Sequence, residues 1–254
     1  MLADVDVSPF PFQGPLSPDE LRGRNDLVGH LIERVTSRRV TALLGPRRFG
    51  KTSVLRRVAA EIEAANVTVV HVDLYEVSSM ADVAVRLDQA LDVARGPGLD
   101  RLRLLVSGEI SLGVVKLMFA KRPADQPDPV AVLHVLLDAL VATAERHPTV
   151  VVFDEFAGID RVDGAAGLLR TKLQAHVQQI GLVFAGSQPS LMRSMFTDVA
   201  RPFYGQADLV EIGPLDGRAI HQIVDEGFRS TGRDPGNLGA HIYEFTDGHP
   251  QRSM

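Results

Sequence analysis

The chain has 254 residues, a formal net charge of −5 and 45% hydrophobic residues, which suits one α/β domain of ordinary size with a small appendage. It contains no cysteine, so disulfides and thiolate metal sites are excluded. No apolar run approaches the roughly 18 residues that a membrane span needs, and the acidic N-terminus lacks the basic-then-apolar order of a signal peptide. We therefore expect a cytoplasmic protein that does not contact a membrane.

Three segments differ in their patterning. Residues 1–20 are rich in proline and show no hydrophobic period, which predicts an extended or disordered strap. Residues 21–215 alternate between helical and strand patterns and are predicted to form one α/β domain, with an insert at 96–127. A helix predicted from about Asp216 to Phe228 opens the last segment, 216–254.

The segment Gly45–Thr52 fits the pattern G-x-x-x-x-G-K-[ST], the phosphate-binding loop of nucleoside triphosphatases. Two glycines allow the backbone to curl so that successive N–H groups point at a phosphate. Lys51 would place its charge between the β- and γ-phosphates, and the Thr52 hydroxyl would bind Mg²⁺. The predicted phosphate-binding residues are Gly45, Pro46, Arg47, Arg48, Phe49, Gly50, Lys51, Thr52 and Ser53.

The surroundings of this loop support the motif. Residues 40–44 are an apolar run of strand length, and Val54, Leu55, Val58 and Ile62 recur at helical spacing. Strand, glycine loop and helix are the arrangement that a phosphate-binding loop requires. Residues 22–57 also carry ten basic residues against two acidic ones, a local charge that would attract a triphosphate.

Between the loop and the next chemical motif the pattern is less informative. Residues 67–75 are predicted to form a buried strand, and Asp73 near its end suits either the nucleotide site or a helix cap. A helix is predicted to run to about Arg95. Within the insert, the two apolar runs of residues 102–120 predict a β-hairpin. This hairpin would either form a partner-docking surface or pack on the next helix. A buried helix is expected after Pro129.

The run Val150–Glu155 supplies the second half of the predicted machinery. Four apolar residues indicate a buried strand, and two carboxylates follow at the strand end that faces the ligand in an open parallel sheet. Asp154 is predicted to hold Mg²⁺ through its waters, and Glu155 to orient and deprotonate the attacking water. Both are predicted catalytic residues together with Lys51.

Further elements follow in the expected order. A helix is predicted over 163–179, a strand over 180–187, a short helix over 190–196 and a weaker strand over 209–212. Ser187 ends the strand that follows the acidic one. It is a candidate catalytic residue that would hydrogen-bond the γ-phosphate or the water, and it is equally suited to a plain polar strand end.

Taken together, these motifs resemble the archaeal-type ATPases of the STAND class, relatives of the AAA+ and origin-recognition ATPases. The resemblance rests on Gly23-Arg24, Gly45–Thr52, Val152–Phe156, Gly186-Ser187 and Gly248-His249-Pro250, and it covers residue 21 to the end. It implies a P-loop NTPase fold, an α/β/α sandwich with a parallel sheet of order 5-1-4-3-2 and the start of a helical lid. It also implies that Gly23 and Arg24 lie near the nucleotide base and that Pro250 touches the nucleotide.

Two departures from the family pattern stand out. Relatives commonly carry Gly-Arg where this chain has Gly205-Gln206, so an arginine acting there is absent, with Arg193 and Arg201 as possible substitutes. The chain also stops at Met254, shortly after Pro250, where relatives continue into a winged-helix domain. We expect a truncated chain or a minimal module with a partial lid.

The resemblance implies ATP as ligand, Mg²⁺ as cofactor and slow ATP hydrolysis used as a conformational switch, with a protein partner or self-association. One alternative is a DNA-associated, loader-like ATPase, which the net charge of −5 does not favour and which would need a basic winged helix. Another is a nucleotide-gated scaffold that binds ATP or ADP and hardly turns over. Pathway, trigger and oligomeric state are not encoded in these motifs.

Overall fold

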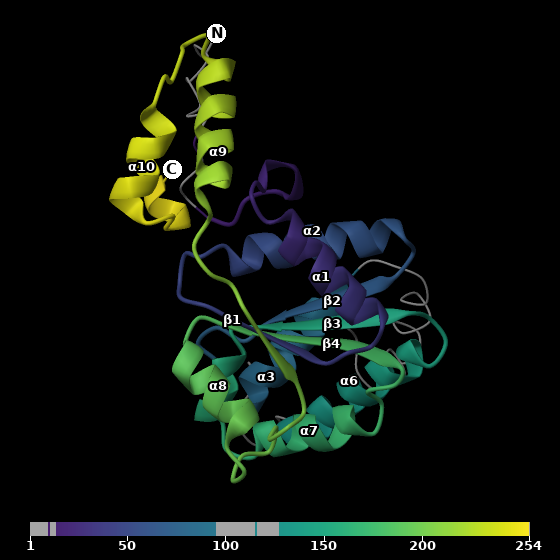
Figure 1. Cartoon of the computed structure of the whole chain (residues 1–254). Helices are drawn as coiled ribbons and strands as arrows, with labels where there is room; N and C mark the ends of the chain where they lie inside the picture. Colours follow the sequence, from purple (N-terminus) through teal and green to yellow (C-terminus); the bar gives the residue numbers. More distant parts are fainter. Residues whose placement is uncertain (1–9, 11–13, 95–114, 116–126, 254) are drawn as a thin grey trace, which may run out of the picture.

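The computed structural model describes residues 10, 14–94, 115 and 127–253, which form a central parallel sheet with helices on both faces (Figure 1). The strands are β1 Thr41–Leu44, β2 Thr68–Asp73, β3 Thr149–Asp154, β4 Ile180–Gly186 and β5 Asp208–Glu211. They pair in the order β2-β3-β4-β1-β5. The order 5-1-4-3-2 expected from the sequence is this order read from the opposite edge, so the predicted fold class is confirmed.

Alternate residues of each strand face two separate cores. Val150 and Val152 of β3 pack with α1 (Asn25–Thr36) and α2 (Lys51–Ala64), whereas Val151 and Phe153 face the opposite layer. That layer contains α3 (Met80–Val93), α6 (Pro129–Ala144), α7 (Ala165–Gln174) and α8 (Pro189–Thr197). Because both faces are covered, the inner strands β1, β3 and β4 are largely apolar, whereas the edge strand β5 begins and ends with the exposed Asp208 and Glu211.

The chain then forms a separate cluster of helices, α9 (Gly217–Ser230), α10 (Leu238–Thr246) and the short η4 (Pro250–Ser253). We call residues 216–253 the C-terminal helical unit. It has a small core of its own, which includes Ile220 and Val224, and Phe10 from the N-terminal segment packs against it. Figure 1 shows α9 and α10 standing beyond the α2 side of the sheet layers.

Several predicted boundaries differ from the structure, among them those of two helices. The helix expected over 163–179 is α7, Ala165–Gln174, preceded by an unpredicted 3₁₀ helix η3, Phe156–Arg161. It ends early because the chain must reverse into β4, and residues 175–179 make that turn with Ile180 N–H donating to the His176 carbonyl at 3.1 Å. The helix expected to reach Arg95 ends at Val93.

Three other segments bear on the predictions. Helix α10 was not predicted; it packs through Leu238, Gly239 and Ile242, while Phe245 on it is 91% exposed. The predicted hairpin lies outside the described residues apart from Val115, which is helical and fully buried. The strap contains a 3₁₀ helix, η1 Pro18–Glu20, begun by a Ser17 capping box. No helix in the described ranges is long and apolar enough to cross a membrane.

An aromatic cluster lies beneath the carboxyl end of β3. Phe156 contacts Phe184 at 4.5 Å between ring centroids and Phe203 at 5.1 Å, in tilted and edge-to-face geometries. The cluster consists of Phe153, Phe156, Phe184, Phe196 and Phe203. Since Phe153 and Phe156 flank Asp154 and Glu155 directly, the cluster fixes the backbone that carries both carboxylates.

Phe156→Ala should therefore destabilise the fold by about 3–5 kcal/mol, the usual cost of emptying a buried phenylalanine site. The measurement is the free energy of unfolding from chemical denaturation. Phe245→Ala is the matched control, because that ring is 91% exposed, and it should cost about 0.5 kcal/mol or less. Similar losses for the two variants would contradict the assignment of Phe156 to the core.

The C-terminal helical unit is joined to the segment before it by a close backbone contact at Gly248. Leu215 N–H donates to the Gly248 carbonyl at 2.8 Å, and a Cβ at Gly248 would lie 2.0 Å from the Leu215 carbonyl oxygen. Gly248 also has φ +69°. Both features require glycine at this position.

Gly248→Ala should cost more than the roughly 1–2 kcal/mol of a left-handed alanine, because the Leu215 backbone must also move. Gly232→Ala provides the control, since Gly232 has φ +70° and a Cβ added there would meet nothing within 4 Å. Because both variants place alanine at a positive φ, their free energies of unfolding should differ only by the cost of the clash with the Leu215 carbonyl. If they are equal, the contact at Gly248 does not constrain the unit.

Candidate functional site

The phosphate-binding loop connects the end of β1 to the start of α2. Gly50 adopts φ +88° and Arg48 φ +68°, so two left-handed residues curl the loop before α2 begins at Lys51. Gly45 has no room for a side chain, because a Cβ would lie 2.2 Å from Ile212 Cγ2. The loop and the amino end of α2 therefore have the form that directs backbone N–H groups at an anion.

Lys51 is held inside this loop. Its Nζ donates to the Gly45 carbonyl at 2.8 Å and the Pro46 carbonyl at 3.0 Å, and only 5% of the residue is exposed. Burial lowers the pKa of Lys51, although the charges of Glu155 and Asp154 raise it. Phosphate oxygens carry more negative charge than these two carbonyls and would bind the ammonium more strongly.

The two predicted magnesium ligands lie together. Thr52 Oγ1 donates to Asp154 Oδ2 at 2.9 Å, and His71 Nε2 lies 3.7 Å from the same oxygen. Burial alone would raise the pKa of Asp154, but its interactions with His71 and Thr52 outweigh it and hold the pKa below the usual aspartate value. This carboxylate is therefore kept ionised.

A hydroxyl and one carboxylate fit Mg²⁺ better than a transition metal. Among the described residues no group of three or more His, Asp or Glu side chains could hold a metal by itself. Mg²⁺ typically uses one or two carboxylates and completes its shell with waters and substrate phosphates. Thr52 and Asp154 match that requirement.

Glu155 is positioned by an unusual backbone and by Ser187. Its φ of +50° and ψ of +40° are left-handed, a conformation that non-glycine residues adopt only where the surroundings enforce it. Its Oε2 accepts hydrogen bonds from Ser187 Oγ at 2.7 Å and Ser187 N at 3.2 Å. The strand-end serine predicted from the sequence thus contacts the carboxylate predicted to activate water.

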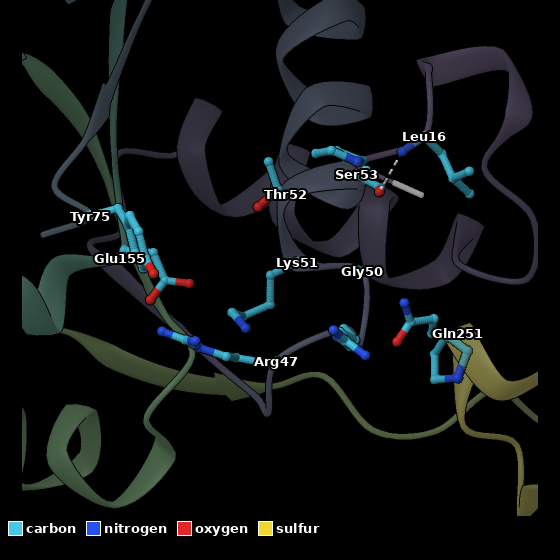
Figure 2. Close-up of a pocket in the computed structure, with 13 residues that line it drawn as sticks. Leu16, Arg47, Gly50, Lys51, Thr52, Ser53, Tyr75, Glu155 and Gln251 are labelled. Carbon is cyan, nitrogen blue, oxygen red and sulfur yellow. Dashed lines mark hydrogen bonds between the residues drawn. The ribbon is translucent and has the colours of Figure 1, made fainter. Parts of the chain in front are cut away.

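A cavity of about 740 Å³ is lined by Lys51, Thr52 and Glu155, whereas Asp154 and Ser187 contact these residues without lining it. Figure 2 shows Lys51 and Thr52 at the start of α2 facing Glu155, with Leu16 and Gln251 farther along the cavity. Its walls come from the strap, the phosphate-binding loop with α2, the ends of β2 and β3, and the C-terminal helical unit. The lining residues are Gly14, Pro15, Leu16, Arg47, Arg48, Gly50, Lys51, Thr52, Ser53, Tyr75, Glu155, Pro250 and Gln251.

Several predicted residues lie elsewhere. Gly23 and Arg24, expected near the base, do not line the cavity. Arg24 donates to the Gly213 carbonyl at 2.7 Å and to the Phe49 carbonyl at 3.4 Å, and burial lowers its pKa. Arg24 therefore joins the phosphate-binding loop to the segment leading into α9. Asp73, which suited a site or a cap, accepts from Tyr75 N at 2.9 Å.

Phe49 and Pro250 connect the loop to the C-terminal helical unit. The Phe49 ring meets the His249 ring edge-on at a centroid distance of 4.9 Å, and Pro250 lines the cavity. The two arginines considered as substitutes for the missing one pair elsewhere, Arg193 with Glu211 and Arg201 with Asp160. Neither lines the cavity.

The strap and two side chains supply lining that sequence reasoning missed. Leu16 N donates to Ser53 Oγ at 3.0 Å and Arg57 donates to the Pro18 carbonyl at 2.9 Å, so the strap is fastened along α2. Nothing in the spacing of the strap pointed to the cavity. Gln251 directly follows the predicted Pro250, and Tyr75 is the last residue of the predicted strand 67–75, so adjacency was the available signal.

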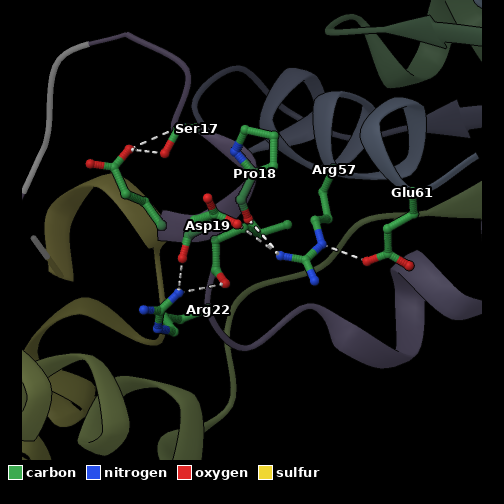
Figure 3. A network of polar contacts seen from close by, with 8 residues as sticks. Ser17, Pro18, Asp19, Arg22, Arg57 and Glu61 are labelled. Carbon is green, nitrogen blue, oxygen red and sulfur yellow. Dashed lines mark hydrogen bonds and ion pairs between the residues drawn. The ribbon is translucent and has the colours of Figure 1, made fainter. Parts of the chain in front are cut away.

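The strap is fastened to the C-terminal helical unit as well. Figure 3 shows Arg57 between Pro18 and Glu61 of α2, and Arg22 at the other end of η1. Arg22 Nε pairs with Glu226 Oε2 of α9 at 2.6 Å. Phe10 packs on Phe228 of α9 at 6.0 Å between ring centroids. The strap therefore bridges α2 and α9 beside the cavity.

Known structures share this fold. The Walker-type ATPase of Pyrococcus abyssi superposes with a TM-score of 0.68 at 19% identity, over 96% of this chain and 68% of that one. An Aeropyrum pernix ORC2 protein with bound ADPNP and ADP superposes with a TM-score of 0.60 at 18% identity, over 95% of this chain and 63% of that one. The A. pernix ORC1 protein in complex with DNA superposes with a TM-score of 0.58 at 16% identity, over 92% of this chain and 58% of that one. The chain thus spans roughly three fifths of the length of the two A. pernix proteins.

No curated protein matches the chain significantly. A family model does, over residues 28–252, and it describes an ATPase domain predominantly from Archaea. The matched region contains the phosphate-binding loop, Asp154-Glu155 and Pro250. The chain therefore belongs to this family of archaeal-type ATPase domains.

Proposed function

We propose that this protein is a Mg²⁺-dependent ATPase of the STAND class, whose nucleotide state acts as a conformational switch. The carrying observation is the composition of the cavity. Lys51 and Thr52 come from the phosphate-binding loop and α2, Glu155 from the end of β3, and Pro250 and Gln251 from the C-terminal helical unit. A triphosphate bound there would contact three parts of the chain that are far apart in the sequence.

The residues suggest how hydrolysis would proceed. Glu155 would accept a proton from water as the water oxygen attacks the γ-phosphorus. The bond to the β,γ-bridging oxygen would break, and its electron pair would stay on ADP. Lys51 would neutralise charge on the phosphates, and Mg²⁺ held at Thr52 and Asp154 would supply further positive charge.

The switch would follow from loss of the γ-phosphate. After hydrolysis, no single ligand would contact the phosphate-binding loop, Glu155 and the C-terminal helical unit at the same time. We propose that this unit then acts as a lid, moving relative to α2 and passing the change to a protein partner or a second copy. The contacts of Leu16 in the strap and of Arg22 just after it support a coupling between the two parts.

A second candidate is a nucleotide-gated scaffold with very slow turnover. The two hydrogen bonds from Ser187 to Glu155 Oε2 favour it, because they occupy the carboxylate oxygen that would accept a proton. The scaffold would bind ATP and ADP through the same loop.

Lys51→Ala should weaken binding of ATP and ADP by about 100-fold or more, because the ammonium is buried at the phosphate position and makes charge-assisted hydrogen bonds. Isothermal titration calorimetry with Mg²⁺ measures the affinities. Lys172→Ala is the control, since Lys172 pairs with Asp138 on an exposed surface away from the cavity. Unchanged binding by Lys51→Ala would refute the nucleotide site.

Glu155→Gln should keep ATP affinity and lower the single-turnover hydrolysis rate by about 10²–10⁴-fold, because the amide cannot accept the proton. Rapid-quench assays under single-turnover conditions give the rate. The scaffold predicts instead that wild type and Glu155→Gln have equal, near-zero rates. Comparing the two chains therefore separates the two candidates.

A further inference from the structure

Arg47 occupies the end of the cavity where Glu155 lies. Its side chain lines the cavity, and Figure 2 shows it running beneath Lys51 toward Glu155. The nucleophilic water must lie near Glu155, on the far side of the γ-phosphate from the leaving oxygen. A group beside Glu155 is therefore placed to contact the γ-phosphate rather than the α- or β-phosphate.

Two contacts hold the guanidinium in that place. Arg47 Nε donates to Ser187 Oγ at 3.4 Å, and the Ser187 hydroxyl in turn donates to Glu155. The Arg47 Cζ atom lies over the Tyr75 ring, 5.6 Å from its centroid. A planar guanidinium can stack on an aromatic ring while keeping its NH₂ groups available, which an ammonium cannot do.

The charge on Arg47 is unpaired by any carboxylate among the described residues. By contrast, a carboxylate forms an ion pair with each of Arg22, Arg34, Arg57, Arg193 and Arg201. Arg47 is also near Lys51: burial is the main cause that lowers the Lys51 pKa, and the charge of Arg47 lowers it further. Two cations that face one cavity favour a multiply charged anion between them.

We propose that Arg47 is a catalytic arginine supplied by the same chain, which binds the γ-phosphate and stabilises the charge that develops during its transfer to water. It would donate N–H groups to γ-phosphate oxygens while Glu155 accepts the proton of the attacking water. No bond to Arg47 forms or breaks. This role rests on the proposed ATPase function, and it offsets the absence of the family arginine next to Gly205.

Other arginines are less suited to this role. Arg193 and Arg201 are in ion pairs and do not line the cavity, and Arg24 donates to backbone carbonyls of the loop and of Gly213. Arg48 lines the cavity, but it makes no contact with Ser187 or Tyr75 among the described interactions. Among these five arginines, only Arg47 both lines the cavity and contacts the Ser187 hydroxyl that binds Glu155.

The first test compares nucleotide affinities, which do not depend on turnover. Calorimetry with Mg²⁺ is carried out with a non-hydrolysable ATP analogue and with ADP on wild type, Arg47→Ala, Arg47→Lys and the control Arg146→Ala. Arg146 is exposed and outside the cavity. Arg47→Ala should lose about 10- to 100-fold in affinity for the analogue and less than about 3-fold for ADP, as expected for one charge-assisted hydrogen-bonding group. Equal losses for both ligands would reduce Arg47 to a general phosphate binder and overturn the proposal.

The second test measures single-turnover hydrolysis. Arg47→Ala should be about 100-fold slower than wild type, Arg47→Lys should recover little of the rate, and Arg146→Ala should be unchanged. A rate for Arg47→Ala within about 3-fold of wild type would overturn the catalytic role. If wild type binds both nucleotides but does not hydrolyse ATP, the ATPase function fails, while the affinity comparison still decides whether Arg47 binds the γ-phosphate.

Mixing variants tests whether the arginine acts within one chain. Lys51→Ala keeps Arg47 but should not bind ATP, and Arg47→Ala keeps the binding loop. The mixture should hydrolyse ATP no faster than Arg47→Ala alone. Recovery of the wild-type rate in the mixture would show that Arg47 reaches a neighbouring chain, which would overturn the assignment to the same chain.

Discussion

The site depends on one hydrogen bond between the start of α2, which follows β1, and the end of β3. Thr52 Oγ1 and Asp154 Oδ2 are 2.9 Å apart although β4 lies between β1 and β3 in the sheet. The contact exists because α2 starts above the carboxyl ends of the parallel strands, where Asp154 also ends its strand. The twist and spacing of the sheet, and the aromatic packing beneath β3, therefore decide whether a cation could bind.

Two of the acidic and basic groups at this edge are buried, and their environment determines their charge. Lys51 is buried with its ammonium hydrogen-bonded to two carbonyls, near the charges of Glu155 and Asp154, and Asp154 is buried beside Thr52 and His71. Burying charged groups is costly unless they are paired or meet a ligand of opposite charge. The stability of this region and its affinity for a phosphate are consequently linked: a ligand that pairs with Lys51 would also relieve the cost of burying it.

The sequence predicted the sheet and the phosphate end of the site, because both follow from local patterns. Gly45–Thr52 and Val150–Glu155 carry their chemistry in contiguous residues, and parallel strands bring their carboxyl ends together. The other end of the cavity was harder to predict. Leu16 reaches it through a backbone contact with Ser53, which no side-chain pattern encodes. Helix α10 was missed because only Leu238 and Ile242 form its apolar contact, because Gly239 packs so closely that a Cβ would lie 2.6 Å from the His221 ring, and because Phe245 is exposed.

The strap has a consequence for how far the C-terminal helical unit can travel. Phe10 is anchored on α9 and Leu16 on α2, and the six intervening peptide links reach at most about 22 Å when fully extended. While both anchors hold, this covalent tether sets an upper limit to the separation of the two helices at those points. Any wider excursion must first detach an anchor, and if Leu16 is the one released, the cavity loses part of its wall in the same event.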